Sequence, residues 1–398
     1  TGPLILPYCE LYSMERYPEN RAGVFAPQKG GYDAFIPHPL SPRDLVLDEG
    51  LLYLLSKADG ALARLDGVTQ VLPNPDLFVA MYIKKEALLS SQIEGTQASL
   101  QGVLEFEAHL RPRDDINEIQ EVVNYIKALH HGIEKLEFAP FSLDLMNEIH
   151  RFLIQGTRGS HKFPGQLRRV QNWIGLSGGT IQDAVFVPPP PEQVPGLMQD
   201  LEQFIQSSDR TPTLIKAALI HAQLETIHPY LDGNGRMGRL MITFYLYYRG
   251  VLARPLLYLS YYLKKNREKY YTLLNGIRYH GNWGAWLEFF LQGIIEVSNN
   301  SLETAKRVIQ LKEALIEKLL ENNVGGVHAV KLIDMLFNRP ITTIAQIAEE
   351  LQVTRQTATK LVGRFEDIGI VEEITGKVRY KQYMFVDYVR IIEEGTRM

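Results

Sequence analysis

The sequence is poor in cysteine and carries no large excess of charge of either sign. Cys9 is the one cysteine among 398 residues, so an internal disulfide and a cluster of thiolate metal ligands are both excluded. The formal net charge is -4, which provides no general attraction to nucleic acid or to anionic lipid. A chain without disulfides suits a reducing compartment, and we therefore expect a cytoplasmic location.

Long apolar runs are also missing. No stretch approaches about 18 uninterrupted apolar residues, so we expect no membrane-spanning helix and no membrane partner. The first twenty residues lack the basic start and the apolar run of a secretory signal. Apolar residues make up 45% of the chain and charged residues 22%, as in ordinary globular proteins, so the length predicts two or three domains.

The pattern of apolar residues predicts a mainly α fold. Residues 1–43, rich in Pro, Gly and Tyr, are predicted to form an irregular arm. Spacings typical of amphipathic helices follow it, at about 45–65, 76–93, 116–137, 142–155, 192–207, 213–227 and 235–249. Between them, apolar residues of the segment 170–187 flank Ser177-Gly178-Gly179, which predicts a small β-hairpin with a glycine turn.

Residues 325–398 show the element order of a winged helix. A short helix is expected at 344–348 and a second one from Thr354 to Gly369, followed by strand-like runs at 370–374 and 378–385. The unit has ten Lys and Arg against ten Asp and Glu, although its second helix is locally basic. DNA binding, formation of a homodimer and docking of a target protein therefore all remain open for this unit.

The segment His228–Arg239 carries the chemistry. The residues Gly233-Asn234-Gly235 allow successive backbone N–H groups to point into one concavity, and such a nest binds anions. A helix is expected to start at about Gly235, and its N-terminus adds free donors and a favourable dipole. The sequence therefore predicts a phosphate site.

Four charged or titratable side chains around this nest suit nucleotide chemistry. Arg236 and Arg239 are three residues apart on one helix face, where both can reach oxygens of a polyphosphate. Asp232 is a hard oxygen ligand that fits Mg²⁺ on a nucleotide. His228 ends the preceding helix, and its ordinary pKa of about 6.5 suits a general base. Each of these residues taken alone is equally typical of a surface turn.

The twelve residues His-Pro-Tyr-Leu-Asp-Gly-Asn-Gly-Arg-Met-Gly-Arg resemble the signature of the Fic family, with Tyr230 in place of Phe. Shorter stretches are also similar to this family, namely 34–37 (Ala-Phe-Ile-Pro), 72–75 (Leu-Pro-Asn-Pro), 165–168 (Gly-Gln-Leu-Arg) and 188–190 (Pro-Pro-Pro). The resemblance implies a Fic-type helical core at 111–300 with a small β-hairpin flap. This core would follow an N-terminal arm and helical region at 1–110. It would precede a linker helix at 301–324 and a winged helix-turn-helix at 325–398.

The resemblance further implies a protein adenylyltransferase that moves AMP from ATP to a Ser, Thr or Tyr hydroxyl of a target protein, the chain itself included. His228 would be the catalytic base, and Asp232 would hold Mg²⁺. The amides of residues 233–235 would cradle the α-phosphate, with Arg236 and Arg239 on the outer phosphates. An exposed edge of the flap would pair with the backbone of the target.

Ser90 and Glu94 lie well before the catalytic loop and share one face of a helix, four residues apart. A glutamate before Gly95 is also typical of an ordinary solvated helix end. The pattern Ser-x-x-x-Glu-Gly resembles the inhibitory helix of Fic proteins, which implies that Glu94 pairs with Arg239 and inhibits the enzyme at rest. The alternative function is a nucleotide-sensing, DNA-binding transcriptional regulator with little transferase activity.

Overall fold

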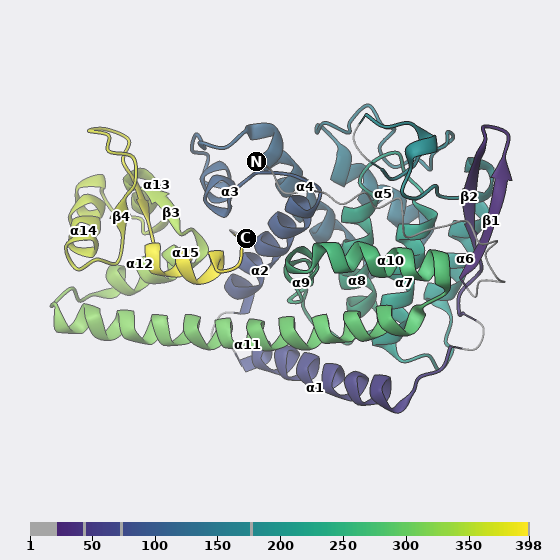
Figure 1. Ribbon diagram of the computed structural model, residues 1–398. Coiled ribbons are helices and arrows are strands. Elements are labelled where there is room, and N and C mark those ends of the chain that lie inside the picture. Colours follow the sequence, from purple (N-terminus) through teal and green to yellow (C-terminus); the bar gives the residue numbers. More distant parts are fainter. Residues whose placement is uncertain (1–21, 43–44, 72–74, 176–177, 397–398) are drawn as a thin grey trace, which may run out of the picture.

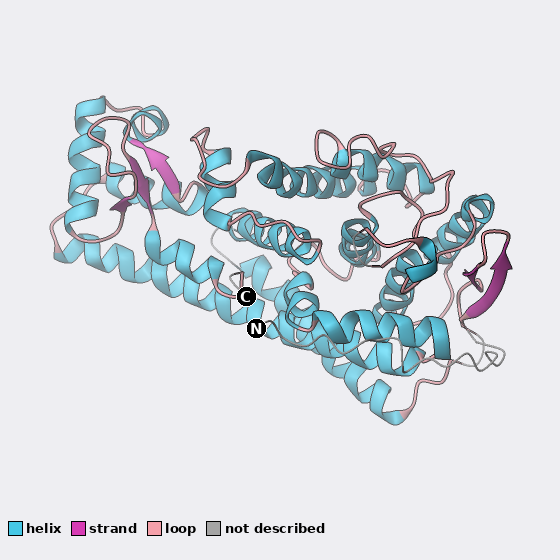
Figure 2. Ribbon diagram, turned by 45° about the horizontal axis from the view of Figure 1, so that its top comes forward, coloured by secondary structure: helices cyan, strands magenta, loops and turns pink. Residues whose placement is uncertain are grey.

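One long helix, α11 (Trp283–Glu321), runs along most of the molecule, and the other elements are arranged on it (Figure 1). The computed structural model describes residues 22–42, 45–71, 75–175 and 178–396. Helix α1 (Glu49–Val71) packs along α11, and the C-terminal unit lies at the opposite end of the molecule from the β1–β2 hairpin (Figures 1 and 2). The residues predicted as a linker helix fall largely in the second half of α11.

The fold is mainly α, as the apolar periodicity predicts. The remaining elements of the first half are β1 Gly23–Gln28, β2 Tyr32–Pro37, α2 Pro75–Ile93, α3 Leu100–Glu107, α4 Ile116–Leu136 and α5 Leu143–Ile154. The elements that follow are the 3-10 turns η2 Ile181–Asp183 and η3 Pro191–Gln193, then α6 Val194–Gln206, α7 Thr213–Ile227, α8 Asn234–Tyr248, α9 Ser260–Lys265 and α10 Arg267–His280. None of the helices among the described ranges is long and apolar enough to cross a membrane.

Helices α7 and α8 form the centre of the core. Every residue of α7 from Leu214 to Ile227 is buried, and α8 packs against it. A helix that is buried on all faces needs no amphipathic stripe, so its position is fixed by neighbours on every side. The connection between these two helices, which contains the predicted catalytic loop, is therefore anchored at both ends in the most tightly packed part of the protein.

The C-terminal unit has the predicted helix-turn-helix followed by short strands. Its elements are α12 Val327–Asn338, β3 Ile341–Thr343, α13 Ile344–Glu350, α14 Arg355–Asp367, β4 Glu372–Glu373, β5 Gln382–Met384 and α15 Val386–Glu393. Thr354 caps α14 with its hydroxyl, and Gly369 follows that helix with a φ of 68°, as the sequence predicts. The strands are shorter than predicted, and β5 lies between β3 and β4 in the sheet.

Two local predictions differ from the structure. Part of the predicted irregular arm is a regular antiparallel hairpin, β1–β2, while residues 1–21 lie outside the described residues. The flap is less regular than predicted, because within 170–187 the described residues make only one isolated bridge, Ile174 with Phe186. Asp183 accepts hydrogen bonds from the N–H and the hydroxyl of Thr180, and such local bonds compete with strand pairing.

The close packing of α4 on α8 gives a stability prediction. A Cβ atom at Gly132 would lie 2.3 Å from Cζ of Phe244, whereas a Cβ at Gly67 of α1 would meet nothing within 4 Å. We expect Gly132→Ala to destabilise the protein by about 1–3 kcal/mol through overpacking, and Gly67→Ala to stabilise it by up to about 1 kcal/mol through helix propensity. Urea unfolding followed by circular dichroism measures both, and equal shifts in the two variants would contradict the packing argument.

Candidate active site

His228 occupies an unusual backbone conformation at the end of α7. Its φ of 49° and ψ of 58° are left-handed, which is uncommon outside glycine. Nε of Arg168 donates to the carbonyl oxygen of His228 at 2.9 Å, and Nη2 of Arg168 donates to the carbonyl oxygen of Pro189 at 2.5 Å. Arg168 is buried, so it ties the loop to the exit of the flap and holds the strained residue in place.

The aromatic residue of the loop is a structural anchor. The Tyr230 ring is fully buried and stacks on the His150 ring, with centroids 3.7 Å apart and an interplanar angle of 6°. The Tyr230 hydroxyl donates to Oδ1 of Asn147 at 3.0 Å. Nδ1 of His150 accepts from the Gly165 N–H, so Nε2 donates to the carbonyl oxygen of Asp232. Burial lowers the pKa of His150 to about 4, which keeps the ring in this neutral form.

The glycine-rich turn forms the start of α8. Gly233 has a φ of 76°, and a Cβ atom there would lie 2.6 Å from Cδ1 of Ile154, so glycine is required. The Asn234 side chain braces the loop by donating to the carbonyl oxygen of Tyr230 and accepting from its N–H. The N–H of Gly233 already donates to Oδ1 of Asp232 at 2.6 Å. The amides of residues 234–236 belong to the first turn of α8, where helix geometry provides no partner.

Arg236 is buried in the site but poorly paired. Its Nη1 lies 3.6 Å from Oε2 of Glu121, and its Nη2 lies 3.8 Å from Oδ1 of Asp232. Nε and Nη1 have no hydrogen-bond partner within the described part of the chain. Unsatisfied donors on a buried guanidinium are costly, so this arrangement favours binding of an additional acceptor.

Glu121 of α4 is a site residue that the sequence reasoning missed. Its buried carboxylate accepts from the hydroxyl of Thr96 at 2.7 Å and from Nε of Arg158 at 2.8 Å. Burial opposes its charge, but these hydrogen bonds and the nearby Arg236 lower the pKa overall. Glu121 therefore links α8 to the turn that follows Glu94. It lies in an ordinary amphipathic helix, where the sequence alone gives no signal for it.

Ser90 and Glu94 contact Arg239, so the structure brings together the three residues that the resemblance connects. Nε of Arg239 donates to Oγ of Ser90 at 2.8 Å, and Nη2 donates both to the carbonyl oxygen of Ser90 at 2.9 Å and to Oε1 of Glu94 at 2.6 Å. The Arg239 side chain is 2% exposed and the Glu94 side chain 35% exposed. These bonds satisfy much of the donor capacity of a buried guanidinium.

The same carboxylate also lies over the predicted anion site. A Cβ atom at Gly235 would be 2.2 Å from Oε1 of Glu94, so this oxygen sits against the first turn of α8. Burial opposes the charges of both partners. Their mutual attraction outweighs it, lowering the pKa of Glu94 and raising that of Arg239, with Arg236 and His228 adding to the effect on Glu94. Glu94 thus occupies a position where an anionic ligand of this helix N-terminus would bind.

The environment of His228 keeps its imidazole neutral. Burial first, and then the positive charges of Arg278 and Arg168, lower the pKa of His228 to about 3. Nδ1 has no hydrogen-bond partner among the residues that the structure describes. A neutral imidazole with an unpaired nitrogen can accept a proton, and a negative charge bound nearby would make it more basic.

Glu225 is a second residue that the sequence reasoning missed. It lies three residues before His228 on α7, is 5% exposed, and its Oε1 has no hydrogen-bond partner in the described ranges. Burial raises its pKa to about 7, although Arg239 opposes this shift. The same helix also contains Lys216, His221 and Gln223, so the sequence alone does not single out Glu225.

The donor set for a metal ion is small. Among the described residues, no group of three or more His, Cys, Asp or Glu side chains could hold a metal ion. The Asp232 side chain is 40% exposed, and Oδ1 accepts only the adjacent Gly233 amide as a short hydrogen bond. One accessible carboxylate fits a Mg²⁺ ion that takes its other ligands from nucleotide phosphates and water.

Comparisons with known proteins match three successive regions of the chain. Residues 52–134 match the Fic/DOC family N-terminal domain, residues 140–246 match the Fic/DOC family, and residues 330–384 match an HTH DNA binding domain. A solved Fic family protein from Desulfovibrio desulfuricans G20 superposes with a TM-score of 0.57 at 19% identity, covering 86% of this chain and 97% of that one.

Two curated relatives carry adenylyltransferase names. One from Aquifex aeolicus (strain VF5), "Probable protein adenylyltransferase aq_aa38", is 35% identical over 91 residues, which is 23% of this chain and 26% of that protein. "Protein adenylyltransferase Fic" of Drosophila willistoni is 31% identical over 244 residues, 57% of this chain and 43% of that protein. The chain spans less than half the length of these relatives. The chain thus contains regions that match the Fic/DOC family N-terminal domain and the Fic/DOC family, followed by a match to an HTH DNA binding domain.

Proposed function

We propose that this protein transfers AMP from ATP to a Ser, Thr or Tyr hydroxyl of a target protein and that Glu94 inhibits the reaction at rest. In this proposal His228 accepts the proton of the attacking hydroxyl. The hydroxyl oxygen then bonds to the α-phosphorus, the bond from that phosphorus to the bridging oxygen breaks, and pyrophosphate leaves. Because the proposed reaction consumes ATP, we also propose that the protein acts in the cytoplasm.

The observation that carries the proposal is the set of unsatisfied donors at the start of α8. The amides of residues 234–236 and the side chain of Arg236 belong to the first turn of α8, and the described residues provide no hydrogen-bond acceptor for Nε and Nη1 of Arg236. Negative charge develops on the phosphoryl oxygens during transfer, and fixed donors stabilise such charge without reorganisation. His228 directly precedes this turn, so a base and an oxyanion site lie on one short loop.

The residues present also fit a bound Mg²⁺ ion, which would be held by Asp232. When bound with ATP, the ion would supply charge neutralisation on the phosphates. Arg236 would bind the phosphate oxygens with its free donors, while Glu121 would keep that guanidinium oriented.

Inhibition follows from competition for one guanidinium. Oε1 of Glu94 lies 2.6 Å from Nη2 of Arg239 and in contact with Gly235. A polyphosphate bound along α8 would therefore meet a carboxylate of like charge. ATP bound beside Glu94 would have its outer phosphates turned away from Arg239, which disfavours in-line attack on the α-phosphorus.

A second candidate function rests on the C-terminal unit. Arg355, Lys360 and Arg364 are exposed on α14, and the loop between β4 and β5 exposes Lys377 and Arg379. The second helix of a helix-turn-helix reads the major groove, so this face supports a DNA-binding regulator. Incubation with radiolabelled ATP and a target extract separates the two candidates. Label on protein supports the transferase, whereas ATP and DNA binding without label supports the regulator.

Replacing His228 should abolish transfer but keep nucleotide binding. Asparagine is the best substitute, because it tolerates the left-handed backbone that His228 adopts. In the Glu94→Gly background, His228→Asn should reduce the transfer rate by about 10²–10⁴-fold through loss of the general base. Calorimetric affinity for ATP serves as the control and should change little. Transfer at the parent rate would show that His228 is not the base.

The depressed pKa of His228 predicts how it titrates. Since burial and two arginines lower its pKa to about 3, the imidazole should stay neutral between about pH 8 and pH 5 in the free protein. Carbon-13 labelling of histidine Cε1 and NMR would follow it, with the signal assigned by its loss in His228→Asn and free histidine as a reference. A midpoint near pH 6.5 would contradict the burial of the ring.

Glu94→Gly should increase the transfer rate by about 10–100-fold, which is the range expected for removing one charge-assisted hydrogen bond that competes with substrate. Arg239 becomes available to the phosphates, so the rate should rise more than the affinity for ATP. Glu94→Gln should activate partly, because it removes the charge but keeps the volume. Glu321→Gly, at the exposed end of α11 and not among the hydrogen-bond partners of Arg239, is the control for a glutamate-to-glycine change at the end of a helix.

Adding Arg239→Ala to Glu94→Gly should cancel most of the gain, because the same guanidinium is then missing for ATP. The proposal of inhibition fails if folded Glu94→Gly transfers AMP no faster than the parent protein at saturating ATP and Mg²⁺.

A further inference from the structure

The C-terminal end of the described chain folds back against α2, the helix that carries Ser90 and Glu94. Nζ of Lys85, in the middle of α2, donates to the carbonyl oxygen of Glu394 at 2.7 Å. The Glu394 carboxylate forms an ion pair with Arg307 of α11. Lys85 is 5% exposed and lies over the Tyr258 ring at 4.8 Å, so its ammonium is confined to this contact. The segment after α15 is therefore fixed to both α2 and α11.

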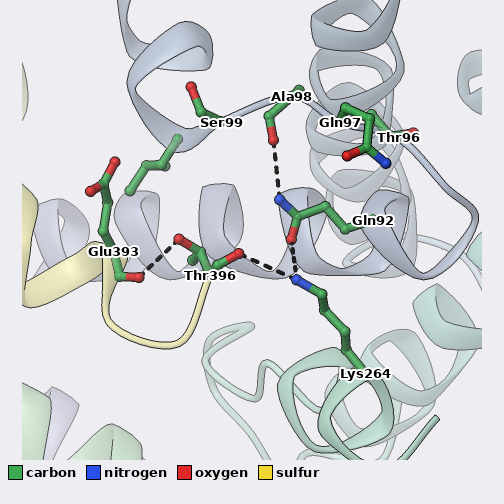
Figure 3. Close-up of a pocket in the computed structure, with 9 residues that line it drawn as sticks. Gln92, Thr96, Gln97, Ala98, Ser99, Lys264, Glu393 and Thr396 are labelled. Carbon is green, nitrogen blue, oxygen red and sulfur yellow. Dashed lines mark hydrogen bonds between the residues drawn. The ribbon is translucent and has the colours of Figure 1, made fainter. Parts of the chain in front are cut away.

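A chain of hydrogen bonds extends from this segment to the turn around Glu94 (Figure 3). Nζ of Lys264 donates to the carbonyl oxygen of Thr396 at 3.3 Å and to Oε1 of Gln92 at 2.8 Å. Nε2 of Gln92 donates in turn to the carbonyl oxygen of Ala98 at 3.1 Å. Gln92 and Ala98 stand on either side of Glu94 in the sequence, so the chain of bonds closes the turn that holds this carboxylate.

The helix after the turn is also held by the C-terminal unit. Nε2 of Gln346, in the first turn of α13, donates to the carbonyl oxygen of Ala108 at 2.8 Å, just past the end of α3. The segment from Gln92 to Ala108 is thus bonded directly to the C-terminal unit at its Ala108 end, and through Lys264 of α9 at its Gln92 end. Residues far apart in the sequence, near 92–108 and 346–396, share one interface.

This interface contains unfilled space beside its hydrogen bonds. A cavity of about 350 Å³ lies beside the Lys264 hydrogen bonds, lined in part by Gln92, Thr96, Lys264 and Thr396. A second cavity, of about 190 Å³, lies between α3 and the start of β3. An interface held by a few hydrogen bonds beside unfilled space separates at lower cost than a close-packed apolar one.

We propose that the C-terminal unit, residues 325–396, clamps the turn 92–98 and thereby holds Glu94 on Arg239, so that detaching this unit releases the inhibition. The effect on transfer rests on the proposed function, whereas the clamp itself is a statement about contacts. Since coupling between two sites is reciprocal, a ligand that binds the detached C-terminal unit more tightly would activate the enzyme. Exposed α14 lies at the end of the molecule away from the core, where such a ligand can reach it (Figure 1).

Gly395 offers a substitution that weakens the clamp without touching the catalytic loop. Its φ is 81°, and a Cβ atom there would lie 2.4 Å from Cε2 of Tyr261, the residue after Ser260 of α9. Gly395→Ala should therefore dislodge the C-terminal segment. Gly376→Ala is the matched control, because Gly376 also has a positive φ, 65°, but a Cβ atom there would meet nothing within 4 Å.

Hydrogen exchange of the full chain tests the clamp independently of any activity. Amides of residues 94–99 should exchange about fivefold faster or more in Gly395→Ala than in the parent. The steric and backbone strain at position 395 should lower the population with the C-terminal segment attached by that order. They should stay at the parent rate in Gly376→Ala. Equal exchange in the two variants would overturn the clamp.

Transfer assays then test whether the clamp acts through Glu94. Gly395→Ala should raise the transfer rate several-fold in the parent and add nothing in the Glu94→Gly background. Activation by Glu94→Gly without activation by Gly395→Ala would overturn the inference and leave the proposed function intact. If Glu94→Gly itself gives no activation, the proposed inhibition fails, while hydrogen exchange still decides the clamp.

Lys264→Met provides a second variant, because it removes both hydrogen bonds of the Lys264 ammonium. It should reproduce the faster exchange and the activation. Lys265→Met is its control, since the neighbouring Lys265 pairs with Glu296 and takes no part in the chain of bonds. Parent behaviour in Lys264→Met would also contradict the clamp.

Discussion

The buried guanidinium of Arg239 constrains the whole site. A charge with 2% exposure has to be compensated by nearby acceptors, and Glu94 forms the ion pair with it while Ser90 accepts two further hydrogen bonds. Glu86 lies on the same helix as Ser90 but is held by Ser260 and Tyr125, and burial raises its pKa to about 7. In the proposed mechanism, a polyphosphate takes over the compensation that Glu94 provides at rest, so inhibition and substrate binding depend on the same demand for negative charge.

In the loop His228–Arg239, the residues that fix the backbone differ from those that are left with unpaired groups. Tyr230, Asn234 and Arg168 use their polar groups to fix the backbone, and they leave few groups free. The groups that chemistry could use are Nδ1 of His228 and two nitrogens of Arg236, which make no hydrogen bond in the described part of the protein. Because the loop is anchored between α7 and α8, these groups are positioned by the core and not by the loop itself.

The sequence predicted the mainly α fold, most of the core helices and the helix-turn-helix because each of these is encoded by local periodicity and capping. It did not predict β1–β2, whose pairing depends on packing of Phe35 against Phe25 and Phe186. It also predicted more regular strand pairing in the flap than the structure has. A glycine turn between apolar runs suggests such pairing, but local side-chain hydrogen bonds replace it there. The contact of Glu94 with Arg239 was implied by the family resemblance, whereas the two hydrogen bonds of Arg239 to Ser90 were not predicted, and the roles of these residues stay predictions.

Glu121, Glu225 and His150 were missed for a common physical reason. Each is a polar residue on a helix whose role is set by partners far away in the sequence, such as Thr96 and Arg158 for Glu121. A short motif reports only the groups that one loop brings together, whereas these residues are brought to the loop by the packing of α4, α5 and α7. The same holds for the contacts of the C-terminal unit, since Glu394 and Thr396 reach α2 and α9 only because α11 carries the chain to the far end of the molecule and α15 runs back toward α2 (Figure 1). The proposed control of Glu94 thus depends on long-range packing, whereas the residues proposed to bind the nucleotide are almost all found in twelve consecutive positions.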